Sequence, residues 1–127
     1  MANLDQIINY VADNIIIETG EQNYWKYRKW ADGTAECWYN HTFSGVNTAG
    51  TFSGWQYATI GTLPSFPTNL FIEAPAVMIG DMKWGTGFCY SAVREVTSSQ
   101  ITKVDVFSTN IGDKSGKLSF HAIGKWQ

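Results

Sequence analysis

The sequence predicts a mainly β protein, an antiparallel β-sandwich or barrel of about eight strands that follows a short N-terminal helix. Aromatic residues make up 15% of the 127 residues, charged residues make up only 16%, and twelve glycines accompany many Thr, Ser and Asn residues. This composition is typical of β-rich proteins. After residue 20, apolar and polar residues alternate with a period of two, and no helical periodicity follows. The length fits one domain.

Residues 1–14 form the first predicted unit, a short helix. Its apolar residues recur at helical spacing: Leu4, Ile7, Ile8 and Val11. Asn3 is a suitable N-cap, and Gln6 completes a capping box. A helix of about ten residues is marginal in water unless its apolar stripe packs on something. Two alternatives remain open: the stripe packs on its own domain, or it forms a short bundle with other copies, since it also fits heptad positions a and d.

Residues 15–127 form the second predicted unit, the β-sandwich domain. The expected strands are 15–18, 24–30, 34–42, 55–60, 69–73, 76–81, 86–96, 100–109 and 117–126. Residues 19–21 are expected to form a turn, and residues 43–54, rich in Gly, Ser, Thr and Asn, a long loop or weak strand. Pro64, Pro67 and Pro75 break up the middle of the chain, so the strands at 69–73 and 76–81 are expected to be short.

The stretch WKYRKWADGTAECW, residues 25–38, predicts a hairpin around Asp32-Gly33, because Asp-Gly between alternating aromatic residues is a strong hairpin signal. A two-residue turn sets Lys29 opposite Glu36, and a pair of aromatic residues further along supports this register. A three-residue loop with Gly33 in the left-handed conformation sets Arg28 opposite Glu36 instead. Both registers remain open.

The two-residue turn leaves neither face of this hairpin polar. One face carries Trp25, Tyr27 and Trp38, and the other carries Tyr24, Trp30, Cys37 and Tyr39. Because a half-solvated sheet normally has one polar face, the second face is expected to meet a lid, a neighbouring subunit or a ligand. Trp30 and Tyr39 are therefore candidate interface residues. The alternative is that both faces lie inside one sandwich.

Charge and targeting signals narrow the class of protein. The net charge is −2 and there is no basic stripe, so no nucleic-acid partner is expected. The apolar run at residues 15–17 is too short to span a membrane, and residues 1–14 lack a signal peptide. Synthesis and folding in the cytosol are therefore expected, with Cys37 and Cys89 as free, buried thiols.

No catalytic pattern emerges, and we expect neither an enzyme nor a cofactor. His41 and His121 are far apart in the chain and are interpreted as packed or edge histidines, and with the two cysteines they do not make a metal site. The eleven acidic residues are scattered without the paired arrangement that glycoside hydrolysis needs. The stretch WGTGFC, residues 84–89, lacks the third glycine of a nucleotide-binding loop.

Two aromatic stretches are candidate ligand-binding sites. A sugar needs an exposed ring as a platform and polar groups nearby to hold its hydroxyls. Trp84 lies between glycines in GDMKWGTG with Asp81 and Lys83 beside it, and is expected in a loop. Trp55 and Tyr57 follow a glycine-rich stretch in SGWQY. The alternative for each tryptophan is packing in the core.

Both ends of the chain resemble a known type of module. The stretch YWKYRKWADGTAECW, residues 24–38, and the terminal FHAIGKWQ resemble a module at the C-terminal end of tail and baseplate proteins of phages and prophages of Gram-positive bacteria. The opening MANLDQIINYVADN is similar to the start of short proteins of the same kind. Residues 43–116 match only in style, and Tyr39 stands where such modules often have glycine.

This resemblance implies a function but no catalytic residues. It implies a virion-associated β-rich domain near the host-contacting tip of the tail, homotrimeric, with other tail or baseplate proteins as partners. Binding of a saccharide on the bacterial cell surface would be its expected role. The alternative is a structural or adaptor protein of tail assembly that has no ligand of its own.

Overall fold

A computed structural model describes residues 3–6, 14–61, 63–84, 89–109 and 111–127, with the backbone alone for residues 81–84. Within these residues nine strands form two antiparallel sheets, which confirms the predicted β-sandwich. The strands are β1 (Ile16–Gln22), β2 (Trp25–Trp30), β3 (Thr34–Asn47), β4 (Gly50–Phe52), β5 (Trp55–Ile60), β6 (Ala76–Trp84), β7 (Cys89–Val96), β8 (Ile101–Ser108) and β9 (Asp113–Lys125). The five-stranded sheet has the order β1-β2-β3-β9-β6, and the four-stranded sheet has the order β4-β5-β8-β7.

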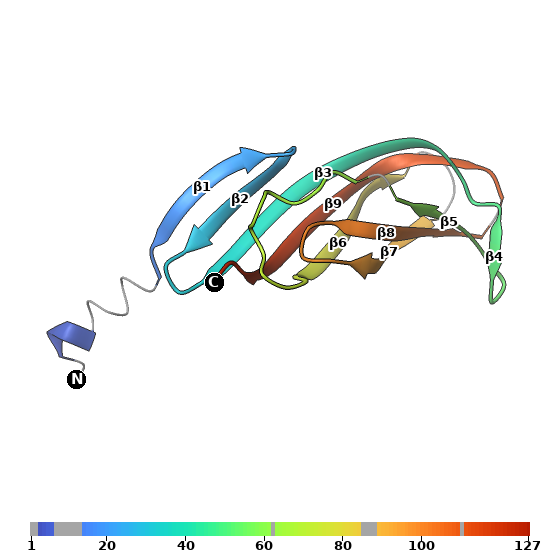
Figure 1. Ribbon diagram of the computed structural model, residues 1–127. Coiled ribbons are helices and arrows are strands. Elements are labelled where there is room, and N and C mark those ends of the chain that lie inside the picture. The colour runs from blue at the N-terminus through green and yellow to red at the C-terminus, as the bar shows by residue number, and fades with distance from the viewer. Residues whose placement is uncertain (1–2, 7–13, 62, 85–88, 110) are drawn as a thin grey trace.

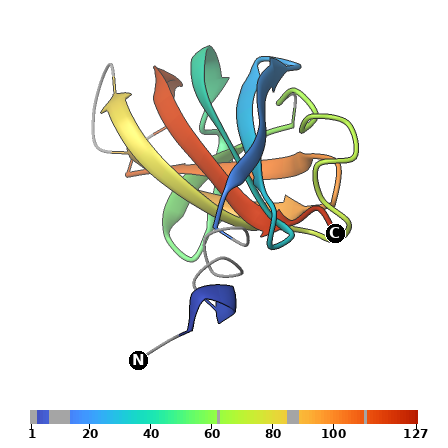
Figure 2. The same cartoon turned by 90° about the vertical axis from the view of Figure 1, so that its left-hand side faces the viewer.

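The two sheets differ in extent. In Figure 1 the five-stranded sheet arches over the four-stranded one, and β1 and β2 lie beyond the end of the smaller sheet. Figure 2 shows the strands of the smaller sheet running across those of the larger one. The apolar core lies between the sheets, and part of the larger sheet needs a cover other than the smaller sheet.

The connection between β5 and β6 supplies that cover. Leu63, Phe66, Leu70 and Phe71 of this connection are buried in the core. The Phe66 amide donates to the Ser99 carbonyl at 2.8 Å, which ties the segment to the smaller sheet's β7–β8 turn. Residues 69–73 form turns and bends, so the strand predicted there is wrong. Leu70 and Phe71 fill the core, whereas Ile72 is exposed, and Asn69 has a φ of 58°, which a regular strand does not allow.

Trp25 links the hairpin to this connection. Its side chain is fully buried, and its indole Nε1 donates to the Pro64 carbonyl at 3.0 Å. The indole meets Phe66 edge-on at a centroid distance of 5.0 Å and lies 5.3 Å from the Tyr39 ring. A buried indole N–H needs an acceptor. The Pro64 carbonyl provides one, and proline has no backbone N–H that would itself need a partner.

The hairpin between β2 and β3 has the three-residue loop. Arg28 lies opposite Glu36, so that alternative is confirmed and the two-residue register is wrong. Gly33 has a φ of 93°, and its amide donates to the Trp30 carbonyl at 3.1 Å. The Asp32 carboxylate accepts from the Thr34 amide at 2.8 Å, which closes the loop.

This register changes which side chains share a face. Tyr39 packs against the core on the inward face, and its hydroxyl makes a hydrogen bond of 3.0 Å with Nδ1 of His41. Trp30 and Trp38 lie on the outward face, where both rings contact Arg28. The assignment of Trp30 and Tyr39 to one face is therefore wrong, because a one-residue shift moves one strand's side chains to the other side. Contact of either residue with a second copy stays a prediction.

The first turn of the sheet differs from the predicted one. Residues 19–21 lie within β1, and the turn is formed by Asn23 and Tyr24. Both turn residues have positive φ values, 54° and 72°, as a two-residue hairpin turn of type I′ requires. Glycine is the usual choice at the second position, so Tyr24 gave no turn signal in the sequence.

The N-terminal helix is described only at residues 4–6, where its capping box is confirmed. The Gln6 amide donates to the Asn3 side chain at 2.9 Å, and the Asn3 amide donates to the Gln6 side chain at 3.1 Å. Leu4 is 70% exposed, and the helical turn lies clear of both sheets in Figure 1. Ile7, Ile8 and Val11 lie outside the described residues. No helix in the described part of the chain is long and apolar enough to cross a membrane.

The remaining strands follow the predictions with shifted ends. The segment 43–54, expected as a loop or weak strand, contains the end of β3 and the short strand β4. Cys37 in β3 and Cys89 in β7 are buried and unpaired with each other, as expected. The two thiols belong to different sheets.

We expect Gly33→Val to lower the free energy of unfolding by about 1–3 kcal/mol, because a β-branched residue resists the left-handed conformation. An added Cβ would also lie 3.3 Å from the Gln127 carbonyl oxygen. Urea denaturation measures the effect. Gly80→Ala is the control, since its Cβ would make only ordinary contact with Ser119. Equal stability of the two variants would contradict the assigned loop.

We expect neither thiol to react with iodoacetamide in the folded protein, and both to react after denaturation. Burial raises the pKa of the Cys37 thiol, and the nearby charge of Glu36 raises it further, so the reactive thiolate is scarce at neutral pH. Cys89 is only 6% exposed. Intact mass before and after denaturation counts the labelled thiols. A denatured protein that gains label only after reduction would show that the thiols are paired.

Candidate functional site

An aromatic row crosses the outward face of the four-stranded sheet. Tyr57 of β5 lies opposite Phe107 of β8, and Phe107 lies opposite Tyr90 of β7. Directly opposed residues in antiparallel strands point to the same face. The alternate positions Val104 and Val106 are fully buried in the core, so the row faces outward. We call Tyr57, Phe107 and Tyr90 the aromatic row.

The rings of this row hold one another in place. Tyr90 and Phe107 stack at a centroid distance of 5.0 Å with 14° between their planes, and Tyr57 lies 6.3 Å from Phe107. Trp55 meets Tyr90 edge-on at 5.5 Å. Gly50 of β4 leaves room for the Tyr57 ring, because a Cβ there would lie 2.7 Å from it. The result is a nearly continuous aromatic surface that has few ways to rearrange.

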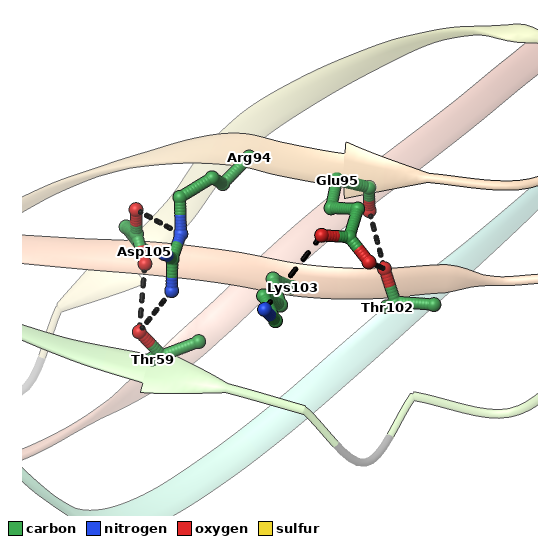
Figure 3. Close-up of polar contacts among 6 residues, drawn as sticks. All are labelled: Thr59, Arg94, Glu95, Thr102, Lys103 and Asp105. Carbon is green, nitrogen blue, oxygen red and sulfur yellow. Dashed lines mark hydrogen bonds and ion pairs between the residues drawn. The ribbon is translucent and has the colours of Figure 1, made fainter.

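A polar row runs beside the aromatic one, two residues further along each strand. Thr59 and Ala92 both lie opposite Asp105. Figure 3 shows Arg94 reaching from β7 toward Asp105 and Thr59. Arg94 Nε lies 3.0 Å from Asp105 Oδ2, and Thr59 donates to Asp105 Oδ1 at 2.8 Å. Arg94 Nη2 donates to the Thr59 hydroxyl at 3.1 Å, which closes a triangle of three side chains.

The triangle stabilises a carboxylate that is largely removed from water. The Asp105 side chain is 12% exposed, whereas that of Arg94 is 50% exposed. A carboxylate in such a position is costly unless charge and hydrogen bonds compensate it. Arg94 and Thr59 provide both, and these two contacts leave further N–H groups of the Arg94 guanidinium available. The arrangement therefore fixes one acceptor and one donor group at the edge of the aromatic row.

A hollow of about 200 Å³ lies where the two rows meet, lined by Phe52, Tyr57, Arg94, Asp105 and Phe107. Successive rows are about 7 Å apart, since a strand rises about 3.3 Å per residue. An apolar ring face can lie on the aromatic row while hydroxyl groups reach Arg94 and Asp105. Aromatic walls with a few fixed polar groups are the usual features of a small-molecule site.

A second polar cluster continues the face beyond Arg94 (Figure 3). Thr102 donates to Glu95 Oε1 at 2.9 Å, and Lys103 Nζ lies 3.6 Å from Glu95 Oε2. The hydrogen bond from Thr102 and the charge of Lys103 hold the pKa of Glu95 below its usual value. Each cation in these two clusters has a carboxylate partner, so the face is close to neutral.

The structure places the predicted site residues in two different sheets. Trp55 and Tyr57 lie in β5 and belong to the aromatic face just described. Asp81, Lys83 and Trp84 lie in β6, at the edge of the five-stranded sheet, and their side chains are outside the described part of the structure. Trp84 ends a strand, so its expected position in a loop is wrong.

Six residues of the aromatic row, the triangle and the hollow were missed from the sequence: Phe52, Thr59, Tyr90, Arg94, Asp105 and Phe107. The alternation in ITKVDVFS, residues 101–108, is a signal that puts Asp105 and Phe107 on one side of a strand. Pairing between strands places Tyr57 and Tyr90 beside them, and single-sequence patterns do not show that pairing.

The two histidines lie on opposite sides of the five-stranded sheet. His41 faces inward between the rings of Tyr39 and Phe43, and burial lowers the pKa of its imidazole. His121 faces outward, with Nε2 2.8 Å from a Glu36 carboxylate oxygen. Among the residues that the structure describes, no three His, Cys, Asp or Glu side chains come together to hold a metal ion.

Comparison with known proteins shows similarity of fold. No protein-family model and no curated protein matches the sequence. The solved structure of an N-truncated R1-type pyocin tail fibre is similar, with a TM-score of 0.57, 15% identity and coverage of 98% of both chains. A C-terminal fragment of the R1 pyocin fibre of P. aeruginosa is similar over 98% of this chain and 32% of that fragment, with a TM-score of 0.51 and 15% identity.

We expect Arg94→Ala to lower the free energy of unfolding by about 1–2 kcal/mol, because Asp105 keeps its charge but loses its cationic partner. Urea denaturation at neutral pH measures the loss. The control is Lys103→Ala, which breaks an exposed ion pair and should cost less than about 0.5 kcal/mol. Equal losses in the two variants would show that the Asp105 triangle contributes no special stability.

Proposed function

We propose that this chain is a host-surface binding module of a phage-type tail, and that the outward face of its four-stranded sheet binds a bacterial saccharide. One observation carries the proposal: three rings in a row beside the fixed Arg94–Asp105 pair. The row provides a platform for the apolar face of a pyranose. The pair provides a donor and an acceptor for its hydroxyl groups.

Two independent similarities support the proposal that this chain is part of a phage-type tail. The ends of the chain resemble modules of phage tail and baseplate proteins, and the fold is shared with two structures of R1 pyocin tail fibres. At 15% identity the second likeness concerns the fold alone. We therefore propose location in the virion tail, after synthesis in the host cytoplasm, with other tail or baseplate proteins as partners.

We further propose that the chain works as a homotrimer. Leu4 is 70% exposed, and Ile15, Ile16 and Ile17 are between 42% and 52% exposed. Exposed apolar side chains in this number are costly unless another surface covers them. A bundle of N-terminal helices, with the predicted stripe of Ile7, Ile8 and Val11, would place the following isoleucines of neighbouring copies close together.

The proposed mode of action is binding without catalysis or cofactor. Asp105 is engaged by both Arg94 and Thr59, and such a carboxylate is suited to orienting a hydroxyl group rather than to moving protons. The second candidate function is an adaptor of tail assembly with no ligand. Close mutual packing of the aromatic row favours it, since packed rings also stabilise a sheet without any ligand.

Low affinity per copy is expected and is compatible with this role. Stacking of one sugar contributes about 1–3 kcal/mol by analogy with other ring platforms, so a single site should bind at about millimolar concentration. Linked copies raise avidity by about 10² or more. A trimer carried several times on a tail would therefore adhere firmly through sites that are weak alone.

We expect Tyr90→Ala to abolish adhesion of beads coated with the protein to host bacteria, because it removes the end of the aromatic row. Tyr24→Asn is the matched control: it removes an exposed ring, and asparagine tolerates the positive φ of that turn. Trp84→Ala, made in parallel, tests the other predicted platform. Adhesion is counted by microscopy, and the melting temperature verifies folding of each variant.

If the folded Tyr90→Ala variant adheres normally and the folded Trp84→Ala variant does not adhere, the ligand-binding site lies on β6 instead. Normal adhesion of both variants would favour the adaptor function. Native mass spectrometry tests the trimer separately, and a single species of 14.2 kDa would contradict it.

A further inference from the structure

The outward face of the five-stranded sheet is cationic in an otherwise acidic chain. Its described charged side chains are Lys26, Arg28, Lys117 and Lys125 against Glu21, Glu36 and Asp113, placed outward by the strand register. The whole chain has a net charge of −2. This face therefore attracts anions, in contrast to the balanced face of the four-stranded sheet.

Arg28 is held rigidly in the middle of this face. Its guanidinium carbon lies 4.8 Å from the ring centre of Trp38 and 5.5 Å from that of Trp30. Its Nε lies 2.6 Å from one Glu36 oxygen, and the other Glu36 oxygen lies 2.8 Å from His121 Nε2. Within the described part of the chain, no group accepts a hydrogen bond from the two terminal nitrogens of Arg28. The Arg28 side chain is 38% exposed.

A hollow of about 290 Å³ opens beside this group, lined by Arg28, Glu36, Trp38, Asn40, Ser119, Phe120 and His121. Asn40 and Ser119 lie opposite each other in β3 and β9 and form part of the lining. Neither side chain has a hydrogen-bond partner among the described residues. Trp38 and His121 meet edge-on at 6.4 Å on the same face. The hollow therefore combines an aromatic wall with side-chain donors that have no partner among the described residues.

We infer that this hollow is a second binding site, which takes a saccharide bearing a phosphate or carboxylate group. The planar fork of an arginine matches the two oxygens of such an anion, and two indoles and a carboxylate already fix the fork of Arg28. Asn40 and Ser119 are placed to hold sugar hydroxyls. The inference does not rest on the aromatic row of the other sheet, and either site can fail alone.

A nucleic acid fits this face less well than a single charged sugar. The backbone of a nucleic acid repeats its phosphates, and a protein that follows it needs a continuous stripe of cations. Here Glu21 lies opposite Lys26, and Glu36 lines the hollow itself. The acidic groups interrupt any such stripe but leave room for one anion at Arg28.

Titration of ¹⁵N-labelled protein with glucose 6-phosphate tests the inference. We expect shifts of the indole N–H signals of Trp30 and Trp38 and of the Asn40 side-chain amide, with a Kd of about millimolar. Arg28→Lys keeps the charge but loses the fork, and should weaken binding about tenfold. Asn40→Ala should weaken binding about threefold or more, since a held hydroxyl loses its partner. Asn47→Ala, an exposed asparagine of the same strand, should not change the Kd.

Four results would overturn the inference. Glucose binding as tightly as glucose 6-phosphate would remove the role of the anion, and inorganic phosphate binding equally tightly would remove the role of the sugar. A single-stranded DNA oligonucleotide that binds the hollow more tightly would indicate a nucleic-acid site. Shifts confined to Trp55 and Tyr90 would place the ligand on the other sheet, and would leave the proposed function standing without this second site.

Discussion

The hydrogen bond from the buried Trp25 indole to the Pro64 carbonyl is the contact on which the architecture depends. The hairpin of β1 and β2 extends past the smaller sheet, so its inward face would otherwise be open to water. Trp25 fills that space and ties the hairpin to the long β5–β6 connection. Burying a side chain of this size stabilises the protein by about 2–3 kcal/mol, but only while its N–H keeps an acceptor.

The same contact determines which side chains of β2 point outward. With Trp25 inward, side chains alternate along β2, and Arg28 and Trp30 must point outward. The three-residue loop then sets Arg28 opposite Glu36, beside the outward Trp38. The cationic hollow therefore follows from core packing and turn chemistry. A two-residue turn would have separated Arg28 from its carboxylate.

Much of the fold could be predicted from the sequence, because a period of two is a local property. Local signals also identified the capping box of Asn3 and Gln6 and the special conformation of Gly33. Two features could not be predicted. The turn at Asn23–Tyr24 uses a residue with no turn signal, and the position of Arg94 over Asp105 depends on which strands pair. Only Trp55 and Tyr57 of the candidate site were predicted for that reason, since they lie on one strand and most of their partners lie on two others.

Pairing between strands brings residues of separate segments together on one face of a sheet. Tyr57, Phe107 and Tyr90 come from three separate segments, yet register makes them neighbours at fixed spacing. Such a site costs little to preorganise, because the backbone that positions it is already required for the core. It is also shallow, so the proposed ligand would be only partly buried and each copy would bind weakly. Shallow sites on rigid sheets would therefore suit the proposed action in many copies, and the different charge balance of the two faces would let the two proposed sites take ligands of different charge.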